Sequence, residues 1–245
     1  METSSEEAME ISEPSIEHFA MSTLPLFHGP LVQIHIEPSN REYTVSKNLL
    51  CSESPVFSAM FQRSFRESEE HTATLQEIPG VLSIQSFEAL LQWIYHRTVR
   101  FDEKFEESCI KAAAELAKLA EMYRITRIEA PIAQYIKGIY STSGHLNGIR
   151  CRYILPDDED MVLGTGLREG HPVRRVMAQA FVIWYLHIPE DERDAGDLAT
   201  QECPKFGADL LFELREMLET LSPRHRFTIK EPITGRKRFL KKDDE

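Results

Sequence analysis

The chain has few cysteines, and no two of them are close in sequence. Cys51, Cys109, Cys151 and Cys203 form neither a C-x-x-C pair nor a Cys/His cluster at zinc spacing. The first residues are acidic and polar, whereas a secretory leader is basic and then apolar. No apolar run approaches the length of a membrane-spanning helix. We therefore expect no disulfides and no membrane anchor, and a cytoplasmic or nuclear location.

Local signatures of catalytic and cofactor sites are also absent. None of the nine histidines lies in H-E-x-x-H or beside a nucleophile signature. Gly164-Thr165-Gly166 does not follow a clear strand, and the acidic run 157–160 lacks the spacing of an EF-hand loop. We predict no catalytic residue, no metal, no cofactor and no enzyme activity. An enzyme site between two lobes stays an alternative, which convergent titratable groups in a pocket would support.

Charge is unevenly distributed along an acidic chain of net charge −12 at pH 7. Such a chain gains little from phosphate attraction, so we expect no nucleic-acid partner. Residues 1–28 contain six glutamates and no Lys or Arg, which predicts a disordered acidic tail. Residues 223–245 are predicted to be a basic tail because they contain Arg236-Lys237-Arg238 and Lys241-Lys242. This tail could be solvated, a nuclear import signal or a surface for an acidic partner.

Alternating apolar residues predict a small sheet in the first half. Val32, Ile34 and Ile36 alternate with polar residues, and turn chemistry follows, which predicts a β-hairpin over 31–46. Residues 72–76 are β-prone and placed to join the same sheet. Caps and helical spacing predict helices after Ser54-Pro55 and over 86–96, 105–122 and 128–140.

The pattern of apolar residues in the second half predicts an all-α lobe. The polar, Gly-containing stretch 141–148 is the predicted boundary between lobes, within a linker and irregular acidic loop over 141–171. Apolar residues at helical spacing then predict helices over 172–187 and 206–221, within a helical C-terminal region 172–222.

Six stretches of the first half have the order and spacing of a known family. They are Val32-Gln33-Ile34-His35-Ile36, Tyr43-Thr44-Val45-Ser46-Lys47-Asn48-Leu49-Leu50, Ser54-Pro55-Val56-Phe57, Phe87-Glu88-Ala89-Leu90-Leu91-Gln92-Trp93-Ile94-Tyr95, Ala112–Tyr123 and Ile128–Ile139. Together they resemble the BTB/POZ domain. The resemblance implies an α+β fold over 29–140, with a small mixed sheet capped by helices, followed by the all-α lobe. That helical extension is similar to those of fungal BTB proteins.

The resemblance implies a protein–protein interaction module whose partners could be itself, a cullin-type scaffold or a client. Phe65-Arg66-Glu67 resembles the hydrophobic-x-Glu segment by which some BTB adaptors dock on a cullin-3 ubiquitin ligase. We therefore predict partner contacts at Phe65, Arg66 and Glu67, with Met60 and Phe61 beside them. The alternative for this segment is that Phe65 folds back onto the core.

The resemblance also implies a homodimer interface. Its predicted residues are Val32, Ile34, Ser46, Lys47 and Leu50, with an exposed apolar patch around the first strand. Leu31 and Ser46 stand where many family members have Asp and His, which contribute to a charged pocket at the dimer interface. The alternatives are a monomer in which the acidic tail or the C-terminal helices cover this patch, and a nuclear regulatory cofactor that recruits proteins through the same surface.

Overall fold

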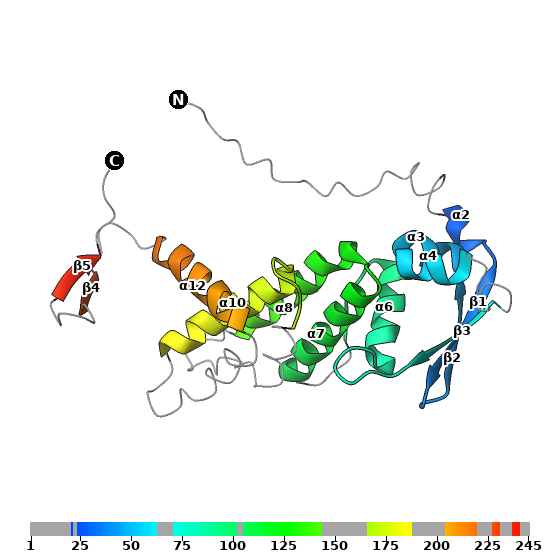
Figure 1. The fold of residues 1–245 in the computed structure, drawn as a ribbon, viewed down its shortest axis with the longest axis horizontal. Helices are drawn as coiled ribbons and strands as arrows, with labels where there is room; N and C mark the ends of the chain where they lie inside the picture. The colour runs from blue at the N-terminus through cyan, green and yellow to red at the C-terminus, as the bar shows by residue number, and fades with distance from the viewer. Residues whose placement is uncertain are drawn as a thin grey trace.

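A small mixed sheet lies at one end of the protein, and helices extend from it in a row (Figure 1). The computed structural model describes residues 21, 24–62, 71–101, 105–143, 166–187, 204–219, 227–230 and 237–240. The sheet occupies the N-terminal end of this arrangement, and helix α12 lies at the other (Figure 1). None of the helices in these ranges is both long and apolar enough to cross a membrane.

The predicted β-hairpin and third strand are both present. Strands β1 and β2 pair antiparallel, β3 runs parallel to β1, and the order is β2-β1-β3. Val32, Ile34 and Ile36 are at most 1% exposed, because alternate residues of β1 face the helices. The strands are β1 Leu31–Glu37, β2 Arg41–Ser46 and β3 Thr72–Gln76.

Serine caps set the helix starts around this sheet. Ser54 Oγ accepts the Phe57 N–H at 3.1 Å, as the predicted cap requires. The helix predicted from Ser86 begins earlier, because Ser83 caps it and forms a capping box with Ser86. The helices of this half are α2 Leu24–Phe27, α3 Lys47–Glu53, α4 Pro55–Gln62, α6 Ile84–His96, α7 Glu106–Met122, η2 Thr126–Ile128 and α8 Glu129–Ser143.

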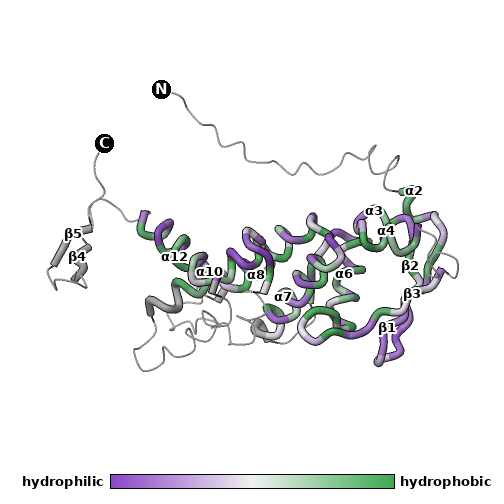
Figure 2. Tube along the Cα trace, in the orientation of Figure 1, coloured by the Kyte–Doolittle hydropathy of each residue, from purple (hydrophilic) through white to green (hydrophobic). Residues whose placement is uncertain are grey.

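Small residues allow α7 to pack closely between its neighbours. Ala113, Ala117 and Ala120 are fully buried, and α7 contacts both α6 and α8. Apolar and polar residues alternate along the helices of both halves, as expected for helices that bury one face (Figure 2).

The second half continues the first rather than standing apart from it. Helices α10 Pro172–His187 and α12 Pro204–Glu219 pack on each other, and α10 also packs on α8. Leu167, Val173 and Met177 belong to the same hydrophobic core as the sheet residues. The last part of the predicted 141–171 linker, which contains Leu167, is therefore part of the packed body. Residues 144–165 lie outside the described ranges.

Two terminal predictions differ from the structure. Residues 24–27, within the predicted disordered tail, form α2, because Leu26 and Phe27 pack against the core. The rest of that tail, apart from Met21 and His28, lies outside the described residues. The predicted basic tail contains an antiparallel hairpin of β4 Phe227–Lys230 and β5 Lys237–Leu240 (Figure 1).

Candidate protein-interaction surface

Three of the five residues predicted for a dimer interface lie in the core. Val32 is 1% exposed, and Ile34 and Leu50 are 0% exposed. The prediction of an exposed apolar patch is therefore wrong for Val32 and Ile34. Their side chains point to the face of the sheet that the helices cover. Leu31, which points to the other face, is 57% exposed.

Ser46 joins four segments at a buried corner. Its Oγ donates to the Leu26 carbonyl at 2.6 Å and accepts the Leu49 N–H at 3.3 Å, capping α3. The Tyr95 hydroxyl accepts the Ser46 N–H at 2.8 Å, and the neighbouring Lys47 N–H donates to the Pro30 carbonyl at 2.9 Å. Ser46 therefore positions α2, β2, α3 and α6 and offers no surface of its own, since it is 1% exposed.

Exposed apolar side chains occur at the start of β1, in α2 and just before α2. Met21, Leu24 and Leu31 are 75%, 42% and 57% exposed, and we call these three residues the N-terminal patch. The backbone just before β1 lies close against α3, because a Cβ added at Gly29 would be 2.2 Å from Asn48 Nδ2. An apolar surface with a fixed backbone beneath it suits a protein partner.

Helix α4 is anchored just before the segment predicted to bind a cullin. Phe61 is 0% exposed and stacks with Phe57, their ring centroids 6.4 Å apart. Met60 is partly buried against the same core. Phe61 therefore contributes to the core and presents no side-chain surface to a partner in this structure. Phe65, Arg66 and Glu67 lie outside the described residues.

A family model of the BTB/POZ domain matches residues 28–139, from the start of β1 through most of α8. These residues form a BTB/POZ domain. BTB/POZ domains are protein–protein interaction modules, which fits the sheet, the capping helices and the exposed N-terminal patch. No curated protein matches the chain.

Polar groups fasten the helical extension to the BTB/POZ domain. The Arg168 guanidinium is paired with the Glu129 carboxylate of α8, whose side chain is 6% exposed. The Arg168 N–H donates to Glu121 Oε1 of α7 at 3.1 Å. His171 is fully buried, its Nδ1 accepts the Val173 N–H at 3.1 Å, and its Nε2 lies 3.9 Å from Glu129 Oε1. These four side chains form the junction cluster.

Burial lowers the pKa of His171 from 6.5 to about 4, with the Arg168 charge acting in the same direction and Glu121 against it. The imidazole is therefore neutral at pH 7. Since Nδ1 accepts a hydrogen bond, the proton is on Nε2, which faces Glu129. None of the junction cluster was predicted from the sequence, because Glu129 and Arg168 are 39 residues apart and the cluster carries no local motif.

A hollow of about 250 Å³ lies between α10 and α12. Arg174 Nε is 2.6 Å from Asp209 Oδ2, and Arg175 Nε is 2.7 Å from Glu213 Oε1. Each lining carboxylate is thus paired with a guanidinium, so the hollow has the chemistry of an ion-paired helix contact. Among the described side chains, no three His, Cys, Asp or Glu converge as metal ligands.

Proposed function

We propose that this protein is an adaptor, whose BTB/POZ domain binds a cullin-3 type scaffold and whose helical extension binds a client. The observation that carries the proposal is the BTB/POZ domain over 28–139. The structure near the predicted docking segment also supports the proposal. Phe61 is fixed in the core, shortly before the segment that resembles a cullin-docking motif. A large apolar side chain that fills a pocket of the partner is expected to be a hot spot.

The Phe65→Ala variant tests the cullin-binding proposal. We expect its affinity for a cullin-3 N-terminal fragment to fall at least about tenfold, because truncating a hot-spot side chain costs upward of about 1.4 kcal/mol. Isothermal titration calorimetry measures the affinity, and the melting temperature should stay nearly unchanged. The matched control is Phe105→Ala, since Phe105 is 70% exposed and lies outside the proposed contact. Equal binding by wild type and Phe65→Ala would contradict this function.

We also propose homo-association through the N-terminal patch, as a second function of the same domain. What favours it is the exposure of Met21, Leu24 and Leu31. Leu24 belongs to α2, which Ser46 holds through the Leu26 carbonyl, and Leu31 pairs with Ser46 in the sheet. Burial of the N-terminal patch against a second copy would remove apolar surface from water.

The Leu31→Asp variant tests this association. We expect a wild-type dimer by multi-angle light scattering at micromolar concentration, and a monomer for the variant, because a carboxylate would be desolvated in the interface. The control is Phe105→Asp, which adds the same charge at another exposed apolar position. A monomeric wild-type chain, or a dimer that tolerates Leu31→Asp, would rule out this surface.

A further inference from the structure

The outer face of α12 has the spacing of a coiled-coil seam. Ala208, Leu211, Arg215 and Leu218 follow one another at intervals of three, four and three residues, as a and d positions do. Leu211 is 68% and Leu218 is 41% exposed, and the Arg215 side chain is 80% exposed. We call these four residues the α12 seam.

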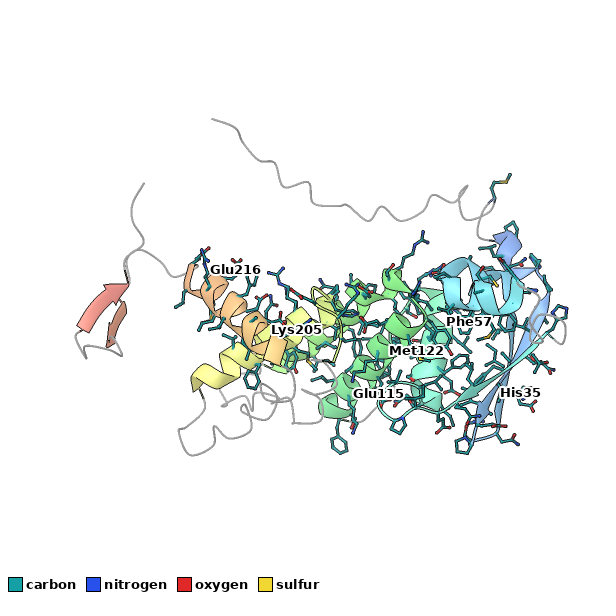
Figure 3. The ribbon with its side chains drawn as sticks, in the orientation of Figure 1. His35, Phe57, Glu115, Met122, Lys205 and Glu216 are labelled. Atoms are coloured by element: carbon teal, nitrogen blue, oxygen red, sulfur yellow. The ribbon has the colours of Figure 1, made fainter. Side chains whose placement is uncertain are left out.

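The inner face of the same helix is already occupied. Phe206 is fully buried against Phe181 of α10, with ring centroids 6.0 Å apart, and Glu213 is 7% exposed in its pair with Arg175. The α12 seam lies on the side of the helix away from these contacts. Within the described part of the chain, nothing covers its leucines. Figure 3 shows α12, through Lys205 and Glu216, well away from Phe57 of the BTB/POZ domain, with Met122 and Glu115 of α7 between them.

Arg215 decides which kind of helix fits the seam. It occupies an a position, where a packed partner would desolvate its guanidinium, which is costly without a carboxylate opposite. In the free protein Glu219 of the next turn supplies one, at 3.2 Å from Arg215 Nε. That pair is exposed to water, so it contributes little that a partner's carboxylate could not replace.

A second copy of this chain is a poor occupant of the seam. Two parallel α12 helices would place one Arg215 against the other, because a positions meet in parallel coiled coils. An antiparallel pair would place each Arg215 guanidinium against a leucine of the other copy. Neither arrangement supplies a carboxylate at the seam itself.

The flank of the seam carries a second guanidinium, which is paired with Glu213. Phe212, the e-position neighbour of the seam, is 53% exposed, and the Arg175 guanidinium lies 5.8 Å from its ring centroid. The Arg175 side chain is itself 57% exposed. A partner that crosses the seam toward the hollow between α10 and α12 therefore meets a second guanidinium beside an aromatic ring.

We propose that the α12 seam binds an amphipathic helix of another protein, whose apolar stripe carries one acidic residue opposite Arg215. This inference rests on the proposed adaptor function, in which the extension binds the client, and it specifies the client's chemistry. The apolar stripe covers Leu211 and Leu218, and the acidic residue replaces Glu219 as the partner of Arg215.

Two synthetic peptides test this proposal on the full-length chain. Each is a labelled helix of three heptads with leucine at a and d, except that the central a position is Glu in one and Lys in the other. By fluorescence anisotropy we expect the Glu peptide to bind at least tenfold more tightly than the Lys peptide. Arg215→Glu should reverse this preference, and Leu211→Ser should weaken binding of both peptides.

The matched control is Arg41→Glu, an equal charge reversal at an exposed position of β2 that should leave the preference unchanged. Binding of neither peptide, equal binding of both, or a preference that Arg215→Glu does not reverse would overturn the proposal. So would a dimer of the wild-type chain that Leu211→Ser abolishes, because the occupant would then be a second copy. Cullin binding is measured independently through Phe65→Ala, so failure of the seam and failure of cullin docking are distinguishable.

Discussion

Replacing Phe57 with alanine lowers the free energy of unfolding by about 3–5 kcal/mol, the usual cost of emptying a large aromatic site in a core. Phe57 is 0% exposed. Its ring stacks on Tyr123 at the end of α7, with centroids 4.4 Å apart, and on Phe61 of its own helix. Ser54 Oγ, which caps the same helix, donates to the Tyr123 carbonyl at 2.6 Å. The cavity would therefore open where α4 meets α7, between segments fixed at several points.

Urea denaturation measures this loss as a shift of the transition midpoint at constant slope. Phe105→Ala is the control, since Phe105 is 70% exposed and its truncation should change the free energy of unfolding by no more than about 0.5 kcal/mol. A loss below about 1 kcal/mol for Phe57→Ala would mean that α4 is not packed against α7 as the structure has it.

Acidification from pH 7 to pH 4 removes about 3 kcal/mol of stability through His171 alone. The folded pKa of His171 is lowered to about 4 by burial, against 6.5 in an unfolded chain. As the pH falls through 6.5, the unfolded chain takes up a proton and the folded protein does not. Stability is therefore full above this window and is lost between pH 6.5 and pH 4.

The variant His171→Asn isolates this contribution. Asparagine keeps a side-chain acceptor for the Val173 N–H at the start of α10, and it does not titrate. We expect the free energy of unfolding of wild type, minus that of the variant, to fall as the pH decreases from 6.5 to 4 and to be constant above pH 7. Carboxylates common to both proteins cancel in this difference. Parallel pH curves would show that His171 is not held neutral in the folded protein.

Most of the local structure could be predicted from the sequence, because strands and helices depend on patterns among residues that are close in sequence. The alternation of Val32, Ile34 and Ile36 identifies β1 together with its buried face. The Ser54-Pro55 cap and the alanines of α7 identify helices in the same way. The start of α6 was placed late because both Ser83 and Ser86 are plausible caps, and only the reciprocal hydrogen bonds of the folded helix distinguish them.

The surface was predicted less well, because exposure depends on which elements cover a residue. Periodicity indicates that Val32, Ile34 and Leu50 are apolar positions, but it does not tell whether helices or a second subunit bury them. The hairpin of β4 and β5 was missed because its four-residue strands are embedded in a strongly basic composition. The α12 seam was also missed, since leucines at helical spacing predict an amphipathic helix without showing which face a neighbour leaves open.

Continuity of the hydrophobic core from the sheet to α10 bears on how a bound cargo would be oriented. Leu167, Val173 and Met177 share that core, so packed side chains hold α10 against α8. Helix α12, which carries the proposed client site, packs on α10 in turn through Phe206 and Phe181, and it lies away from the sheet of the BTB/POZ domain (Figure 1). The distance and angle between a bound scaffold and a bound client would then depend on this side-chain packing. A substitution that loosens the packing would change that distance and angle without altering either binding surface.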